Sequence, residues 1–249
     1  MNELALFAGA GGGILGGKLL GWRTVCAVEF DPYAASVLVA RQNDGLLPPF
    51  PIWDDVRTFD GRPWRGIVDV VSGGFPCQDI SNSGHKAGIE GDRSGLWDSM
   101  RRIVHEVRPR YVFVENVAAL LFRGLGTVLG DLAEMGFDAR WGVLGTSDIG
   151  GAQPRKRLWI VADAEGFGQR SVFEELRLFR SAAKDRAGPP GDRGAQHATN
   201  STGLLRADQS GVGRVADGMA DRMDRIRCAG NGQDPRVAAQ AWRMLTANI

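Results

Sequence analysis

The chain has 249 residues, of which 43% are hydrophobic and 24% charged, and its formal net charge is +1. These proportions are typical of a soluble globular protein with one large α/β domain, or one domain and a small appendage. Every apolar stretch is shorter than the roughly 20 residues that span a bilayer, which excludes a membrane protein. The low net charge excludes a global basic field, so any binding of nucleic acid would depend on local clusters.

The N-terminal sequence MNELALFAGAGGG lacks a positively charged start and leads directly into a structural pattern. We therefore expect it to begin the fold of a cytoplasmic protein, not to form a signal peptide. Strands are predicted, in chain order, at residues 3–7, 24–30, 67–74, 111–117, 137–144 and 157–164. Helices are predicted between them at residues 14–21, 32–43, 95–107 and 125–136. This alternation predicts an α/β fold: a doubly wound, Rossmann-like, parallel-type sheet with helices on both faces.

The pattern changes after residue 164. Residues 165–215 are rich in Gly, Arg, Ser and Asp, which predicts either a small irregular module or a partly mobile insertion. Residues 234–249 form a clear amphipathic pattern that predicts a closing helix. We expect one domain from residues 1–164 plus 216–249, with 165–215 as a small separate region.

A glycine-rich stretch, LFAGAGGG at residues 6–13, follows the first predicted strand and begins a helix. Glycines there allow close approach of a ligand to the backbone and to free helix N–H groups. Glu29 ends the second strand, where an acidic residue can bind ribose hydroxyls, and Phe30 can lie against an adenine ring. The pair Asp54–Asp55, followed by Val56, can hold the adenine amino group at the end of a further strand between residues 43 and 67. Together they predict a pocket for an adenosine-containing cofactor, although a ligand-free turn and solvated loop acids are the alternatives.

Cys77 stands in the stretch SGGFPCQDIS, after two glycines and Pro76. The proline stiffens the turn, and the thiol is expected at the carboxyl edge of the sheet, where a polar setting can lower its pKa. Lone cysteines are usually inert, and Cys26 and Cys228 are interpreted as structural. Three cysteines without CxxC spacing argue against a disulfide framework and against a zinc site.

Two further polar groups follow predicted strands. Glu115 closes YVFVENV, where a partly buried carboxyl group can stay protonated near neutral pH and donate a proton. The alternative is a helix cap formed by Glu115 and Asn116. In QPRKR, Arg155 and Arg157 share one side of an extended segment and can face the site, unless this is simply a solvated basic turn.

In this order the motifs FAGAGG, GGFPCQDIS, ENV, QPRKR and AGNGQDPRVA resemble those of the DNA (cytosine-5)-methyltransferase family, over nearly the whole chain. The resemblance implies S-adenosylmethionine as methyl donor, no metal, and a cytosine flipped out of double-stranded DNA. It implies that Cys77 adds to C6, that Glu115 acts on N3 and the amino group, that Arg155 holds O2, and that Arg157 supports the site. The donor pocket implied in this way comprises Phe7, Gly9, Gly11, Gly12, Glu29, Phe30, Asp55, Val56, Pro76 and Asn231.

The sequence departs from the family in its closing motif, where residues 232–234 precede Pro235, and in the shortness of 165–215, where the family reads its target sequence. The resemblance implies that residues 79–95 form the loop that closes over DNA in this family, with a merely disordered connection as the alternative. A tRNA cytosine-5 methyltransferase and a catalytically silent DNA-binding protein are the alternative functions. We expect a monomer from a phage, prophage or restriction system, with a paired restriction endonuclease as a candidate partner.

Overall fold

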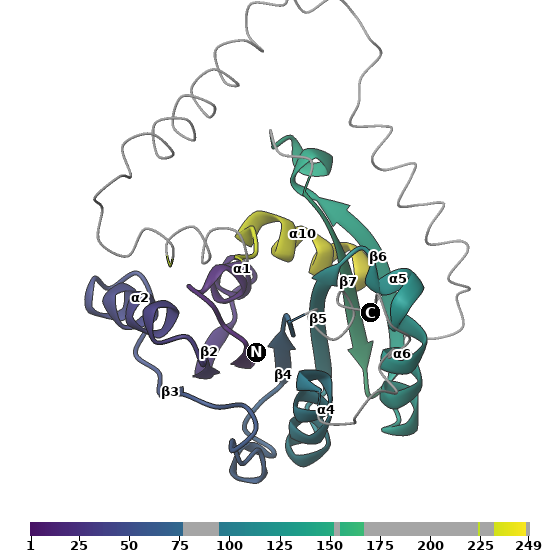
Figure 1. The fold of residues 1–249 in the computed structure, drawn as a ribbon, viewed down its shortest axis with the longest axis horizontal. Helices are drawn as coiled ribbons and strands as arrows, with labels where there is room; N and C mark the ends of the chain where they lie inside the picture. The colour runs from purple at the N-terminus through teal and green to yellow at the C-terminus, as the bar shows by residue number, and fades with distance from the viewer. Residues whose placement is uncertain (77–94, 152–154, 167–223, 225–231, 248–249) are drawn as a thin grey trace, which may run out of the picture.

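The computed structural model describes residues 1–76, 95–151, 155–166, 224 and 232–247 (Figure 1). Its centre is a seven-stranded sheet in the order β3-β2-β1-β4-β5-β7-β6. The strands are β1 (Asn2–Leu6), β2 (Arg23–Val28), β3 (Ile52–Trp53), β4 (Val70–Gly73), β5 (Tyr111–Val117), β6 (Asp138–Gly145) and β7 (Lys156–Asp163). The carboxyl ends of β1, β4 and β5 are therefore neighbours at one edge of the sheet.

The expectation of a parallel sheet is correct for β1 to β5 and wrong for β7, which is antiparallel to both β5 and β6. The cause is the short connection before it. Only residues 146–155 link β6 to β7, whereas a parallel crossover needs a dozen or more residues and usually a helix. The sheet is therefore mixed.

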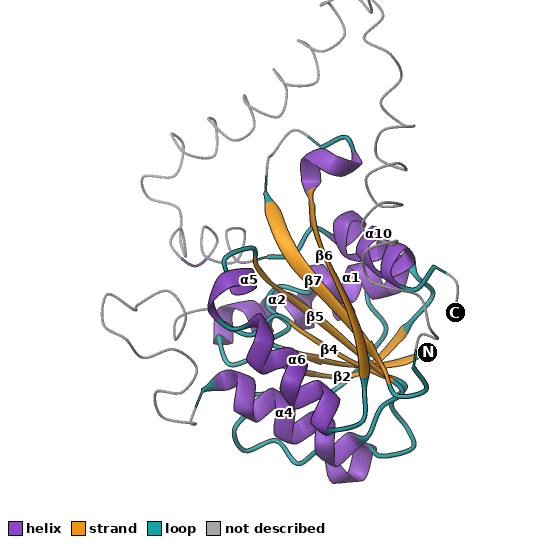
Figure 2. Cartoon of the chain, turned by 90° about the vertical axis from the view of Figure 1, so that its right-hand side faces the viewer, coloured by secondary structure: helices purple, strands orange, loops and turns teal. Residues whose placement is uncertain are grey.

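Helices cover both faces of the sheet, as predicted (Figure 2). One face packs against α4, α5 and α6, and the other against α1, α2 and α10. The helices are α1 (Gly12–Leu19), α2 (Pro32–Asn43), α4 (Leu96–Val107), α5 (Leu120–Arg123), α6 (Leu125–Glu134) and α10 (Pro235–Leu245), with short 3₁₀ turns η1 (Arg62–Trp64) and η2 (Thr146–Ile149). None of these described helices is long and apolar enough to cross a membrane.

Helix α10 lies against α1 and the sheet, although it is far from both in the sequence (Figure 1). Its N-terminus is capped by Asp234, whose carboxylate accepts a hydrogen bond from the backbone N–H of Arg236 at 2.9 Å. Trp242 packs edge-to-face on Trp22 with 4.6 Å between ring centroids. A Cβ added at Gly16 would lie 2.8 Å from the Cβ of Ala238, so a glycine is needed where the helices touch. This packing places the start of α10 beside the glycine-rich loop.

Candidate active site

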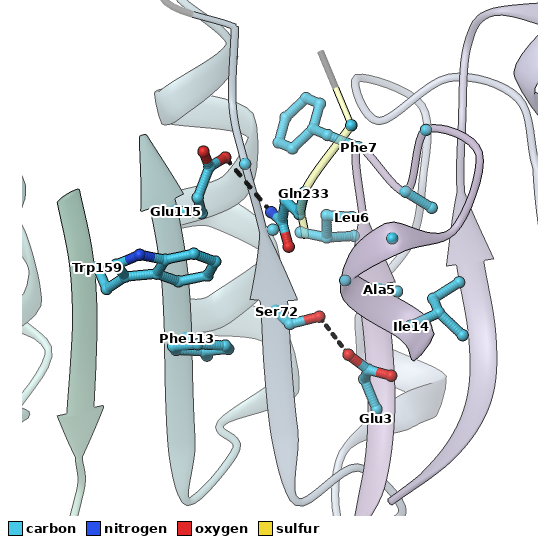
Figure 3. Close-up of a pocket in the computed structure, with 17 residues that line it drawn as sticks. Glu3, Ala5, Leu6, Phe7, Ile14, Ser72, Phe113, Glu115, Trp159 and Gln233 are labelled. Atoms are coloured by element: carbon cyan, nitrogen blue, oxygen red, sulfur yellow. Dashed lines mark hydrogen bonds between the residues drawn. The ribbon is translucent and has the colours of Figure 1, made fainter. Parts of the chain in front are cut away.

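A narrow cavity of about 60 Å³ lies at the carboxyl ends of β1, β4 and β5 (Figure 3). It joins the glycine-rich loop, the end of the strand that leads to Cys77, the acidic residue of β5 and the segment before α10. The lining residues are Glu3, Ala5, Leu6, Phe7, Ala8, Gly9, Gly12, Gly13, Ile14, Ser72, Gly73, Gly74, Phe113, Glu115, Trp159, Gly232 and Gln233. Polar groups from segments far apart in the sequence thus converge on one cavity, as expected of a ligand site in an α/β sheet.

The glycine-rich loop turns sharply after β1. Phe7 has φ 52°, a left-handed conformation that is uncommon for a residue with a side chain and is concentrated at functional sites. Gly9 also has positive φ, and a Cβ there would meet nothing within 4 Å, so the loop is open at that point. Gly11 has a packing role as well, because a Cβ would lie 2.7 Å from Leu38 of α2.

Glu29, just after β2, is tied to this loop. One carboxylate oxygen accepts a hydrogen bond from the backbone N–H of Gly9 at 2.6 Å, and the other accepts one from that of Asp31 at 2.8 Å. A carboxylate oxygen can accept more than one hydrogen bond, so both can still accept one from a ligand hydroxyl. The structure therefore fixes the orientation of Glu29 next to the loop.

The residues predicted to surround an adenine lie outside the described lining of the cavity. Phe30 is 71% exposed, with the Arg57 guanidinium 5.8 Å from its ring centroid. Asp55 forms an ion pair with Arg57, with 2.8 Å between Oδ2 of Asp55 and Nη2 of Arg57. The hydrogen bonds that Arg57 donates lower the pKa of the Asp55 carboxyl group. Val56 is buried, and its carbonyl accepts a hydrogen bond from Arg102 of α4 at 2.9 Å.

Glu115 is a buried acid of the cavity, with 9% of its surface exposed. Its Oε1 lies 2.8 Å from Nε of Arg157, and its Oε2 accepts a hydrogen bond from the amide of Gln233 at 3.4 Å. Burial raises the pKa of Glu115, although the positive charges of Arg157 and Arg155 act in the opposite direction. The group is therefore suited to hold a proton closer to neutral pH than an exposed glutamate would.

The antiparallel register explains why the arginine reaches this acid. Glu115 of β5 pairs directly with Trp159 of β7. Arg157 lies two residues earlier and so shares the face of Trp159, diagonally opposite Glu115. Lys156 is exposed, whereas Arg155 and Arg157 are half-buried, which agrees with the alternation predicted for this segment.

Cys77 and Asn231 lie outside the described residues, and so do most of 79–95 and 165–215. The chain just before Cys77 is well anchored. Phe75 is buried, with its ring centroid 5.3 Å from that of Trp97. Its carbonyl accepts a hydrogen bond from Asn116 Nδ2 at 3.1 Å. Asn116 therefore does not cap a helix but ties β5 to the segment that carries Pro76 and Cys77, a contact that our sequence interpretation missed.

The sequence interpretation also missed a buried polar network at the base of the cavity. Glu3 is 1% exposed, and one of its carboxylate oxygens accepts a hydrogen bond from the hydroxyl of Ser72 at 2.6 Å (Figure 3). Its other oxygen accepts a hydrogen bond from the hydroxyl of Thr24 at 2.7 Å. Burial raises the pKa of Glu3, while both hydrogen bonds act to lower it. In the sequence, the only indication of this network was that Glu3 is a charged residue beside the apolar residues of ELAL.

Replacing Glu3 with glutamine should change how stability depends on pH. A carboxyl whose pKa is higher in the folded chain contributes stability that is present below its unfolded pKa and is lost as pH rises through its folded pKa. Urea unfolding from pH 4 to 8 should show the wild type losing free energy of unfolding relative to Glu3→Gln as pH rises. Parallel curves for the two proteins would contradict this role of Glu3.

The order of the strands, the antiparallel β7 and the glycine-rich loop beside a buried acid define a Rossmann-like α/β fold with a candidate ligand site at the carboxyl ends of its strands. Residues 1–202 match the family described as C-5 cytosine-specific DNA methylase. The chain belongs to this family.

Type II methyltransferase M.Eco47II of Escherichia coli is 37% identical over 198 residues, which cover 73% of this chain and 45% of that protein. Type II methyltransferase M.NgoMIV of Neisseria gonorrhoeae is 32% identical over 165 residues, covering 65% of this chain and 51% of that protein. The chain thus spans about half the length of these curated relatives. The Dnmt2 methyltransferase of S. pombe shares the fold, with a TM-score of 0.54 and 19% identity over 71% of this chain and 53% of that one.

Proposed function

We propose that this protein transfers a methyl group from S-adenosylmethionine to C5 of cytosine in double-stranded DNA. The observation that carries the proposal is Glu115, a buried acid paired with Arg157 on a cavity that also borders the glycine-rich loop. The family match and the relatives named as type II methyltransferases support it. Their names also favour a restriction–modification setting, with an endonuclease of the same specificity as partner.

In the proposed reaction the Cys77 thiolate adds to C6 of a flipped cytosine, and the electron pair of the C5–C6 bond becomes available at C5. Glu115 gives a proton or a hydrogen bond to N3 and takes up the charge that develops there. Arg155 holds O2, and Arg157 keeps the Glu115 carboxyl in place. When the methyl group is on C5, a water molecule takes the C5 proton, the electron pair of that bond restores the C5–C6 double bond, and the C6–S bond breaks to release the Cys77 thiolate. A proton transferred to N3 returns to Glu115.

The methyl donor would supply a methyl group on a positively charged sulfur. The residues present fit such a ligand. Gly9 leaves open space, the Glu29 carboxylate is oriented toward the loop, and Phe30 offers an exposed ring. We propose that these residues hold it together with Phe7, Gly11, Gly12, Asp55, Val56, Pro76 and Asn231.

Replacing Gly12 with alanine should weaken donor binding. An added Cβ would overlap the backbone carbonyl of Gln233, so the loop and the segment before α10 must separate. Overpacking of this kind costs about 1–3 kcal/mol, which corresponds to roughly a 5- to 150-fold weaker Kd if the loss falls on the donor pocket. Calorimetric titration with S-adenosylmethionine measures it. Gly126→Ala on α6, where an added Cβ meets nothing within 4 Å, is the matched control and should bind as wild type; equal affinity for both variants would refute the assignment of this loop.

The proposal is tested by incubating the protein with methyl-labelled donor and either long unmethylated duplex DNA or tRNA. We expect label in the DNA, and bisulfite sequencing of that DNA should locate it on C5 of cytosine within one recurring sequence. Label in tRNA alone would favour the alternative RNA methyltransferase. Label in neither, from a folded protein that binds the donor, would overturn the proposed activity.

A further inference from the structure

We propose that Gln233 is a positioning residue for Glu115: its side-chain amide holds the carboxyl on the side opposite Arg157 and connects it to the glycine-rich loop. The inference rests on the proposed function, in which Glu115 is the acid. Gln233 belongs to residues 232–234, where the closing motif departs from the family pattern. The family match therefore assigns it no role.

The Gln233 side chain lies inside the cavity and points toward Glu115 (Figure 3). Its Nε2 donates to Oε2 of Glu115 at 3.4 Å, while Nε of Arg157 lies 2.8 Å from Oε1. The two donors thus occupy different oxygens of one carboxyl group. A carboxyl held at both oxygens has a fixed plane, which is what proton donation to a ring nitrogen requires.

Two glycines make room for this contact. A Cβ at Gly74 would lie 2.7 Å from Oε2 of Glu115 and 3.1 Å from Nε2 of Gln233. A Cβ at Gly12 would overlap the backbone carbonyl of Gln233. Gln233 is therefore enclosed between the segment just after β4 and the start of α1. Its backbone contacts the glycine-rich loop, and its side-chain amide contacts Glu115.

The backbone of Gln233 is also fixed from its other side. Asp234 caps α10, and Pro235 occupies the first turn of the helix. The face of α10 packs on α1 through Ala238 and Gly16. The residue that carries the amide is thus held by the capped N-terminus of a packed helix. We therefore interpret its contact with Glu115 as a positioning contact.

The electrostatic surroundings determine what loss of this amide would do. Within the described residues, the charged groups acting on Glu115 are Arg157 and Arg155, and Asp234 acts in turn on Arg155. Hydrogen bonds from Gln233 and Arg157 favour the ionised carboxyl, whereas burial disfavours it. Removing only the amide donor should therefore move the titration of Glu115 to higher pH.

The test uses the full chain labelled with ¹³C in its glutamate carboxyl groups, with the Glu115 signal assigned by its absence in Glu115→Gln. We expect the titration midpoint of Glu115 to lie at higher pH in Gln233→Met, which keeps length and shape but has no donor. Gln233→Asn, whose amide is one methylene too short, should show the same direction of change. Gln240→Met, the same substitution on α10 outside the described cavity lining, should titrate as wild type.

A midpoint in folded Gln233→Met and Gln233→Asn equal to that of the wild type would overturn the inference, and an equal change in Gln240→Met would do so as well. Because this measurement needs neither donor nor DNA, it decides the role of Gln233 even if the wild type methylates nothing. If the wild type does methylate DNA, the pH at which kcat falls should move upward in both Gln233 variants and stay unchanged in Gln240→Met.

Discussion

Replacing Cys77 with serine should lower kcat for DNA methylation by about 10³-fold or more and leave the affinity for DNA nearly unchanged. A serine hydroxyl is hardly ionised at neutral pH, whereas the proposed step needs a thiolate to add to C6. Phe75, two residues before Cys77 in the sequence, is buried against Trp97, and its backbone carbonyl accepts a hydrogen bond from Asn116. Single-turnover methylation and a DNA-binding titration on the same preparation measure both effects.

Cys26→Ala is the control for loss of a thiol elsewhere. Cys26 is buried in β2, and burial raises its pKa to about 11, so it is no thiolate at neutral pH. We expect this variant to methylate DNA at a rate close to that of the wild type. Full activity in Cys77→Ser, or loss of activity in a folded Cys26→Ala, would show that the wrong cysteine has been assigned.

Replacing Glu115 with glutamine should lower kcat by about 10²- to 10⁴-fold, the range expected for loss of a general acid. Glutamine keeps the shape and can still contact Arg157, but it has no proton to transfer to N3. The KM for DNA should change little, because the fall is in the chemical step. Glu134→Gln, at the exposed end of α6, is the matched control and should keep the wild-type kcat.

The same acid should shape the pH dependence of the wild type. Burial raises the pKa of Glu115, so the protonated form persists to higher pH than in an exposed glutamate, and kcat should fall as pH rises through that value. The residual activity of Glu115→Gln should lack this fall. A variant with wild-type kcat, or an unchanged alkaline fall in its pH profile, would remove Glu115 from the chemistry.

Local patterns were sufficient for the parts of the site that lie at strand ends. The apolar run 111–117 predicted the strand of Glu115, and alternation in QPRKR predicted that Arg155 and Arg157 share a side. The glycines of 6–13 predicted the turn after β1. These features depend on neighbours in the sequence, which is why periodicity and turn residues reveal them.

The contacts that the sequence did not reveal join segments far apart in the chain. Gln233 reaches Glu115 only because α10 packs on α1. Glu3 contacts Thr24 and Ser72 only because the registers of β1 with β2 and with β4 place these side chains together. Such pairs need the tertiary structure. The reversal of β7 was also missed, because the strands predicted at 137–144 and 157–164 leave twelve residues between them, whereas the strands of the structure leave only residues 146–155.

In the proposed reaction one sulfur atom is bonded transiently to a cytosine ring. A duplex that carries 5-fluorocytosine at the target position cannot lose its C5 substituent as a proton, so the reaction should stop with protein and DNA linked when S-adenosylmethionine is present. We expect a denaturation-resistant complex whose cross-linked peptide contains Cys77, and none with Cys77→Ser. A folded, donor-bound wild type that methylates the ordinary duplex but forms no such complex, or forms it through another residue, would exclude the proposed bond between Cys77 and C6.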